Sequence, residues 1–301
     1  MSAASTRAIA IALLANAGIA VSKFAVFLLT GSSSLLTEAI HSTADCANQV
    51  LLFLGLRLGA KPAGPRHPLG HGQAAFVASF LVALLLFSMG GLYSVVEGIH
   101  KIRHPEAPHH LGWAVGLLGF AILLEGASLR GALRAARVGR HGRSLLRYLR
   151  QSSSTELVVV VAEDIAALAG LVLALAAVLL TMGTGNPVWD GIGSVGIGLV
   201  LLAVALFVGT EVASLLLNEA PPLALRGAIR GAVDEDPAVA RVLNLVAVVV
   251  GSDRIMVALK VQFRDQPSGA ALVAAINALE RNLRARFPQI QHLFVEPDEA
   301  D

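Results

Sequence analysis

Four ionisable side chains lie in the middle of two long apolar runs of the sequence. His41 and Asp45 interrupt the first run, and Glu163 and Asp164 interrupt the second. Ionisable groups within a membrane-spanning segment are energetically costly, and they normally face a bundle interior, where they bind ions or relay protons. All four are potential metal ligands. The pattern therefore predicts a cation-binding site inside a membrane protein.

The first pair belongs to a polar stripe on one predicted helix. Glu38, His41, Asp45 and Asn48 are spaced three, four and three residues apart, so they share one face of an otherwise apolar helix. His41 and Asp45 can reach the same ion from adjacent turns. An imidazole nitrogen with carboxylate oxygens suits Zn²⁺ and other first-row divalent ions. The alternative is a structural His–Asp hydrogen bond that ties helices together.

The second pair consists of adjacent residues. Neighbours on a helix differ by about 100° in direction, so Glu163 and Asp164 cannot point along the same radius. We expect one to face the ion and the other an adjacent helix or a water path. Asp164 then joins His41 and Asp45 as the third ligand, and the fourth is Glu163, Glu38, an amide or water. Late in another apolar run, Glu125 is either an interfacial charge or part of an ion or proton vestibule.

The elements that position these residues are predicted to be membrane helices. Of the 301 residues, 55% are hydrophobic and 15% are charged, whereas about a quarter of a soluble domain is charged. Lys and Arg concentrate in two of the predicted loops, which places both termini in the cytoplasm and indicates contact with lipid headgroups, not nucleic acid. Six runs within residues 1–218 are long enough to cross a bilayer: 8–30, 35–57, 75–99, 110–129, 156–181 and 188–216.

Residues 219–301 have the pattern of a small soluble domain. In residues 254–264, apolar residues alternate with more polar ones, which is typical of a half-buried strand. Ser268 can cap the helix that follows. The element order αββαβ predicts a two-layer α+β domain. Its expected elements are a helix at 222–232, strands at 243–250 and 254–264, a helix from Ser268 to about Arg286, and a strand at 290–295.

At this point the chain resembles the cation diffusion facilitator family of divalent-cation/proton antiporters over nearly its whole length. The segment from Ser32 to Asp45 is similar to the family's second-helix ligand motif. Residues 67–72, HPLGHG, resemble the loop that enters the third helix, and residues 189–194, WDGIGS, resemble the start of the sixth. The resemblance implies export of a divalent cation in exchange for protons. Zn²⁺ is the expected cargo, with Mn²⁺, Fe²⁺ or Co²⁺ as alternatives.

The sequence departs from the family in the fifth helix. The common motif is His-x-x-x-Asp, but Val160 stands four residues before Asp164. Glu163 directly before Asp164 resembles instead a branch with a Glu-Asp pair, which includes mitochondrial members. The transport site implied by the resemblance is therefore His41, Asp45 and Asp164, with Glu163 as an uncertain substitute for the missing histidine.

Two further metal sites of the family are altered. Its accessory loop site uses an Asp at the position of Gly64, which leaves His67 and His71 as candidate ligands or as structural residues. His292 is the only histidine of residues 219–301, so a binuclear site in that domain is lost. We expect a dimerising, ferredoxin-like domain with little or no metal-sensing capacity.

The sequence therefore predicts a polytopic α-helical membrane protein in a bacterial inner membrane. Residues 1–218 would form a six-helix transport domain, and residues 219–301 a cytoplasmic domain of a homodimer. The alternative is a non-transporting membrane partner or metal-binding regulatory subunit with a degraded site, which Val160 favours. An enzyme is not expected, because the chain has neither an HExxH-type motif nor a nucleophile-and-base arrangement.

Overall fold

The computed structural model describes residues 3–106, 110–140, 144–151, 155–264 and 268–299. The chain divides into two compact units. The first comprises Met1–Gly55, Ala78–Tyr148 and Glu156–Val212, and the second comprises Leu56–Val77, Leu149–Thr155 and Ala213–Asp301. The first unit holds His41, Asp45, Glu163 and Asp164, and the second holds the sheet together with the candidate accessory histidines His67 and His71.

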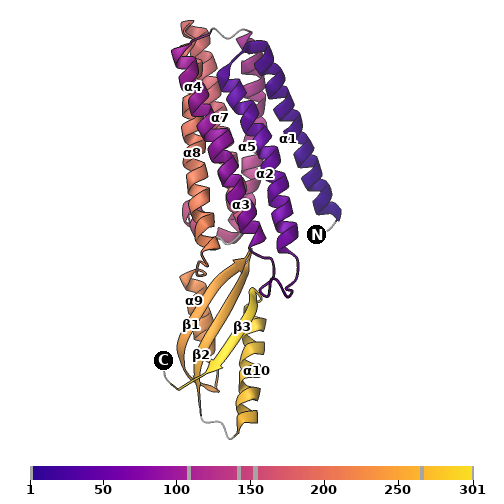
Figure 1. The fold of residues 1–301 in the computed structure, drawn as a ribbon, viewed down its shortest axis with the longest axis vertical. Coiled ribbons are helices and arrows are strands. Elements are labelled where there is room, and N and C mark those ends of the chain that lie inside the picture. The colour runs from indigo at the N-terminus through magenta and orange to yellow at the C-terminus, as the bar shows by residue number, and fades with distance from the viewer. Residues whose placement is uncertain (1–2, 107–109, 141–143, 152–154, 265–267, 300–301) are drawn as a thin grey trace. The chain divides into compact units, whose positions relative to one another are not determined.

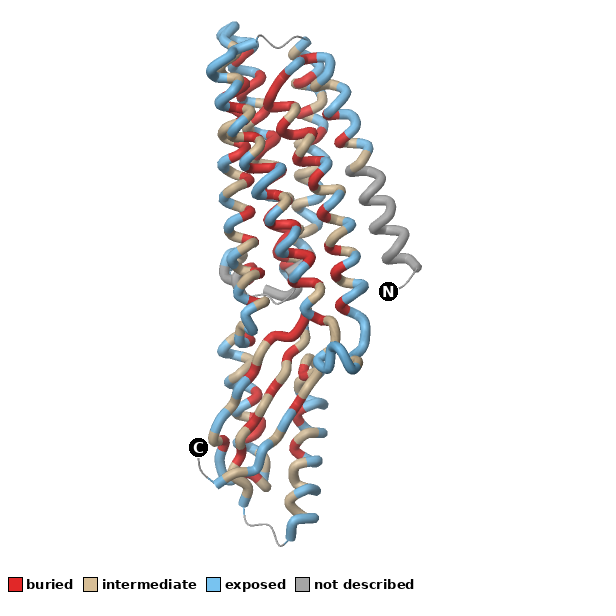
Figure 2. Tube along the Cα trace, in the orientation of Figure 1, coloured by how far each residue is buried: buried red, intermediate tan, exposed pale blue. Residues whose placement is uncertain are grey.

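The first unit is a bundle of long helices that lie side by side in Figure 1. Buried positions recur along the described parts of the long helices (Figure 2). Apolar side chains such as Leu35, Leu118 and Ile197 form its core, whereas outward-facing Leu123 is 73% exposed. The helices are α1 (Ala3–Thr30), α2 (Ser33–Gly59), α3 (Ala74–Leu85), η1 (Leu86–Leu92), α4 (Tyr93–Arg103), α5 (Leu111–Arg140), α6 (Leu145–Gln151), α7 (Thr155–Thr184) and α8 (Val188–Leu216).

Five of the predicted membrane spans fall on α1, α2, α5, α7 and α8, and the third falls on α3, η1 and α4 together. Among the described residues, four stretches are long and apolar enough to cross a bilayer: Ala74–Arg103, Leu111–Arg134, Leu157–Thr184 and Val188–Leu216. Helix α2 has 27 residues, which is sufficient length, but its polar stripe lowers its hydropathy. The protein is an integral, multi-pass membrane protein that is mostly helical.

The third span is interrupted by a π-helical segment. Residues Leu86–Leu92 form η1, which joins α3 to α4, so that the three segments make one continuous helical rod. The Ser88 hydroxyl donates to the Leu84 carbonyl at 2.8 Å, and the Ser94 hydroxyl donates to the Gly90 carbonyl. Serine hydroxyls can satisfy backbone carbonyls that a distorted membrane helix leaves free. The sequence analysis did not anticipate this segment.

Glycines bring this rod close to α8. A Cβ atom on Gly98 would lie 2.7 Å from the Gly191 carbonyl oxygen and 2.7 Å from the Val195 side chain. A Cβ on Gly198 would likewise lie 2.8 Å from the Gly91 carbonyl oxygen. Small residues at helix crossings in membranes allow the two backbones to approach closely. These glycines therefore fix the distance between the third span and α8.

The second unit contains a three-stranded sheet and two helices. The elements are α9 (Leu223–Asp234), β1 (Val239–Gly251), β2 (Arg254–Phe263), α10 (Gly269–Arg286) and β3 (Ile290–Pro297). The strand order is β1-β2-β3, with β1 antiparallel and β3 parallel to β2. Helix α9 packs on β1 and α10 on β3. The predicted order αββαβ is confirmed, and Ser268 caps α10 by accepting the Ala271 N–H at 3.2 Å.

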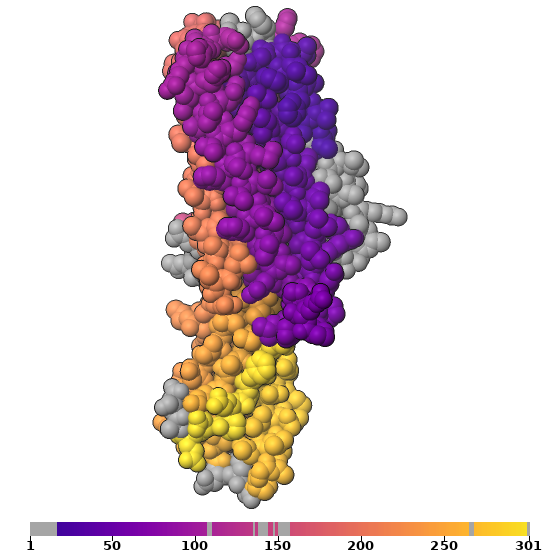
Figure 3. Space-filling view, viewed as in Figure 1, coloured from indigo at the N-terminus to yellow at the C-terminus, as the bar shows by residue number. Residues whose placement is uncertain are grey.

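The loop between α2 and α3 lies against this sheet. Arg254 donates a hydrogen bond from Nη1 to the Gly59 carbonyl at 3.2 Å, and His292 Nε2 lies 3.3 Å from the Leu69 carbonyl oxygen. Gly72 packs on the backbone of Gly251 so closely that a Cβ on Gly251 would lie 2.9 Å from the Gly72 Cα. Figure 3 shows the loop, in dark purple, beside the yellow strand β3.

Candidate functional site

The two predicted ligands on α2 carry buried polar atoms without hydrogen-bond partners among the described residues, although Asp45 as a whole is partly exposed. His41 is 1% exposed, and its Nδ1 lies 3.6 Å from Asp45 Oδ1, which is too long for a hydrogen bond. Three atoms have no hydrogen-bond partner within the described part of the chain: the two ring nitrogens of His41 and the Oδ1 atom of Asp45. Leaving such atoms unpaired costs about 1–3 kcal/mol each. The structural His–Asp hydrogen bond is therefore not formed, and these atoms are available to a ligand.

The acidic pair on α7 faces two different helices. Asn48 of α2 donates from Nδ2 to Glu163 Oε1 at 2.6 Å, and Glu163 is buried. Asp164 is less buried, and its Oδ2 accepts the Ser128 hydroxyl of α5 at 3.1 Å. The divergence predicted for adjacent helical residues is observed. Glu163 points toward the polar stripe of α2, and Asp164 points toward α5.

These carboxyl groups form one electrostatic cluster across three helices. Asp45, Glu163, Asp164 and Glu125 of α5 are close enough to repel one another when charged. Even so, no three His, Cys, Asp or Glu side chains in the described ranges converge closely enough to hold a metal ion. The structure thus places the predicted ligands around one region of the bundle, without the convergence that direct coordination by all of them would need.

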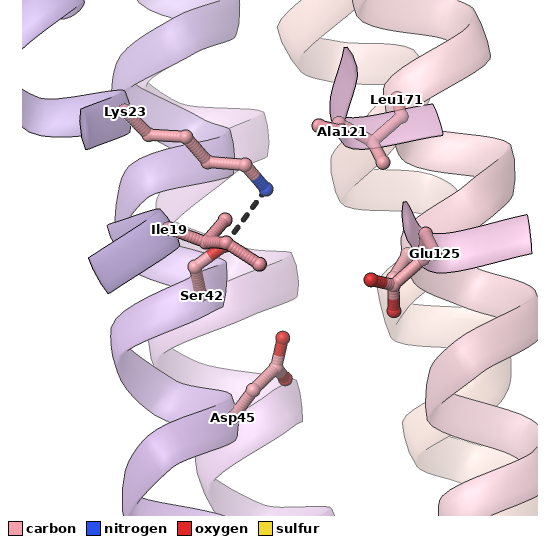
Figure 4. A pocket seen from close by; sticks show the side chains of 8 residues that line it. Ile19, Lys23, Ser42, Asp45, Ala121, Glu125 and Leu171 are labelled. Atoms are coloured by element: carbon pink, nitrogen blue, oxygen red, sulfur yellow. Dashed lines mark hydrogen bonds between the residues drawn. The ribbon is translucent and has the colours of Figure 1, made fainter. Parts of the chain in front are cut away.

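A small cavity opens beside Asp45, and two carboxyl groups of this cluster, Asp45 and Glu125, line it. Its volume is about 30 Å³, which is enough for a water molecule or a small ion. In Figure 4, Asp45 and Glu125 point into the space between their helices from opposite sides. Residues of α1, α2, α5 and α7 line the cavity: Ile19, Lys23, Ser42, Asp45, Ala121, Glu125, Ala167 and Leu171.

Lys23 is a charged residue of this region that the sequence analysis missed. Its Nζ donates to Glu38 Oε2 at 3.0 Å and to Ser42 Oγ at 2.7 Å. Glu38 is fully buried, and its other oxygen faces Gly170, where a Cβ would lie 2.6 Å away. Glu38 is therefore engaged by an ammonium group in this structure. A single lysine inside an apolar run was the available signal, because intramembrane charges are rare and functional.

The start of α2 is held by a buried aspartate of α8. Asp190 accepts hydrogen bonds from the Ser32 hydroxyl at 2.6 Å, from the Ser33 N–H at 2.6 Å and from the Ser34 N–H at 3.3 Å. The Ser33 hydroxyl contacts both Asp190 Oδ2 and Ser194 Oγ at 3.0 Å. Two segments that resemble family motifs, 32–36 and 189–194, are thus one hydrogen-bonded cap. This cap sets the position of the ligand-bearing helix.

The candidate accessory histidines lie together in the loop on the second unit. The ring centroids of His67 and His71 are 4.3 Å apart, with the planes inclined by 50°. The loop is not helical here: Gly64 and His67 exchange backbone hydrogen bonds, and Gly70 has a φ of +84°. His71 Nδ1 is buried and has no hydrogen-bond partner among the residues that the structure describes.

Comparison with known proteins places the chain in a family. The model of the cation efflux transmembrane domain matches residues 9–217. The chain therefore belongs to the cation diffusion facilitators, which are membrane transporters and not enzymes. The family predicted from the sequence is confirmed.

Three relatives illustrate the similarity. The mitochondrial proton-coupled zinc antiporter SLC30A9 of Xenopus laevis is 34% identical over 244 residues, which cover 80% of this chain and 44% of that protein. Its human counterpart is 31% identical over 244 residues, 80% of this chain and 43% of that protein. Metal tolerance protein C4 of Arabidopsis thaliana is 34% identical over 205 residues, 67% of this chain and 45% of that protein. The chain spans less than half the length of these relatives.

Proposed function

We propose that this chain is a secondary active transporter that exports a divalent metal cation, Zn²⁺ first, from the cytoplasm in exchange for protons. The observation that carries the proposal is the set of buried, unpartnered ligand atoms on His41 and Asp45. Imidazole and carboxylate groups must lose protons to hold a dication, so metal binding releases protons and protonation favours metal release. The names of the animal relatives, which specify zinc and proton coupling, support the same reading.

The proposed transport site consists of His41, Asp45, Asp164 and Glu163. Asn48 holds Glu163 against α2, next to the stripe that carries His41 and Asp45. Ser128 holds Asp164 toward α5, so Asp164 must leave that hydroxyl to reach the same ion. We propose that this exchange of partners accompanies metal binding. The proposed accessory residues are Glu38, His67 and His71.

The proposed architecture has six membrane spans within residues 1–218 and a cytoplasmic, ferredoxin-like domain within residues 219–301. The helix bounds and the αββαβ order of the second segment support it. We further propose that the protein forms a homodimer and that both termini are cytoplasmic, as the Lys/Arg distribution favours. The bacterial inner membrane stays a prediction, because the SLC30A9 relatives are named as mitochondrial.

The test is transport by the purified full chain in liposomes that contain a zinc indicator or a proton-sensitive dye. We expect an inward Zn²⁺ gradient to drive proton movement in the opposite direction. Asp45→Asn and Asp164→Asn should each abolish both signals. Glu97→Gln, a change in α4 outside the site, is the matched control and should retain them. Normal transport by both Asp variants would show that the site is wrongly assigned.

The second candidate is a metal-binding regulatory subunit that does not transport. Val160 at the usual histidine position favours it, as does the lack of three converged ligands in the described ranges. The same liposomes separate the two functions when Mn²⁺, Fe²⁺ and Co²⁺ are tested beside Zn²⁺. A chain that binds one of these ions with an affinity sensitive to Asp45→Asn, yet moves none, would be the regulatory subunit.

A further inference from the structure

Lys23 brings an ammonium group to the proposed site, and the proposed transport function assigns no role to it. The side chain is buried, with 4% of the residue exposed. Its two hydrogen-bond acceptors, Glu38 and Ser42, lie on α2 on either side of His41. The ammonium therefore stands next to the polar stripe, although it comes from a different helix.

A role in holding α1 against α2 does not by itself explain why a lysine stands at this position. Replacing a buried ion pair by apolar residues is often neutral or stabilising, because both charges must be desolvated. An ammonium group has three N–H donors, and two of them are engaged within the described part of the chain. Glu38 Oε1 also lacks a hydrogen-bond partner there. The pair is thus incompletely satisfied, which is a poor arrangement for stability alone.

The position of Lys23 relative to the cavity gives it a second role. Lys23 and Ser42 line the cavity together with Asp45 and Glu125, and Figure 4 shows the Lys23 ammonium directed toward Ser42 at the edge of this space. The ammonium attracts both carboxyl groups, Asp45 and Glu125. A cation that enters the cavity therefore meets carboxyl groups whose charge Lys23 already offsets in part.

We propose that Lys23 is a tethered cation that competes with the transported metal for the carboxylates of this cavity and thereby weakens metal binding. The inference rests on the proposed transport function. When the site is empty, the ammonium offsets the charge of Glu38 and of the cavity carboxylates. When a dication arrives, it is repelled by this fixed charge, which is only partly screened in a buried site. A transporter must release its cargo, so this repulsion shortens the time that the metal stays bound.

The test measures Zn²⁺ affinity of the purified full chain in detergent by titration against a fluorescent chelator. Lys23→Gln removes the charge and keeps a side chain that can hydrogen-bond to Ser42. We expect Zn²⁺ to bind at least about tenfold more tightly, with a lower KM and a lower kcat in liposomes. Lys23→Arg keeps the charge and should stay within about threefold of the wild-type affinity.

The outcomes separate this inference from the proposed function. If the wild-type chain binds Zn²⁺ and Lys23→Gln binds it equally or more weakly, the tethered-cation role is overturned while the transport proposal stands. If the wild-type chain binds none of Zn²⁺, Mn²⁺, Fe²⁺ and Co²⁺, both proposals fail. Lys23→Met is the second neutral variant if the Gln variant does not fold. Failure of both to fold, beside a folded Arg variant, would make the charge a structural requirement and overturn the proposal.

Discussion

Removing the Asp190 carboxylate should loosen the helix that carries the proposed ligands. In Asp190→Ala, two serine hydroxyls and the N–H groups of Ser33 and Ser34 lose their acceptor. All of these serines are buried, with 0% exposure, so water cannot replace the carboxylate without opening the bundle. The variant therefore uncaps α2 at its first turn and releases it from α8.

The size of the effect follows from the hydrogen bonds that are lost. A hydrogen bond to a charged group contributes about 1.5–3 kcal/mol, and a buried donor left without a partner costs about 1–3 kcal/mol. Because bonds to one carboxylate are not additive, we take the loss as about 4 kcal/mol. One kcal/mol shifts the Tm of a unit of 150–250 residues by about 2–4 °C. The expected decrease in Tm is therefore about 8–16 °C.

Thermal unfolding of the detergent-solubilised chain measures this decrease. Cys46 is the single cysteine of the chain and lies on α2, so a thiol-reactive fluorophore reports when this helix unfolds. Asp190→Asn keeps one acceptor oxygen, so its Tm should decrease by about half as much as that of Asp190→Ala. Ser194→Ala removes one neutral hydrogen bond to Ser33 and should lower the Tm by about 3 °C. A Tm for Asp190→Ala within 3 °C of wild type would refute the capping argument.

Two further substitutions test close backbone contacts. Gly72→Ala should displace the loop between α2 and α3 from the sheet, because its Cβ would overlap the backbone at the end of β1. Hydrogen exchange of the loop amides should accelerate in this variant. Gly64→Ala, which has open space around it, should leave the exchange rates unchanged. Gly98→Ala should separate α4 from α8 and lower the Tm by several degrees, and Gly116→Ala, which also has open space, should not. Equal exchange rates in the first pair of variants, or equal Tm values in the second pair, would contradict the close backbone contacts described for Gly72 and Gly98.

The sequence predicted those features of the molecule that depend on local pattern. Long apolar runs located the helices, and alternation and Ser268 located the strands and the start of α10. The pairing of Lys23 with Glu38 could not be predicted from the sequence, because it depends on how α1 and α2 are rotated about their own axes. Helical geometry predicts that Glu163 and Asp164, as adjacent residues, point toward different neighbouring helices. Which neighbour each one meets is decided by the packing of α7 against α2 and α5.

The π-helical segment also has a consequence for how this chain can change in length. A π turn holds more residues than an α turn, so η1 accommodates additional chain inside an otherwise continuous rod. Deleting one residue within Leu86–Leu92 would restore the α-helical ladder and leave Tyr93–Arg103 close to its present rotation, because a π turn absorbs an extra residue between two α-helical segments. Gly98 would then keep its place against α8, whereas a deletion within Ala74–Leu85 would turn it away by about 100°. The π-helical segment therefore allows this apolar span to change in length without a change in the rotational phase of its second half.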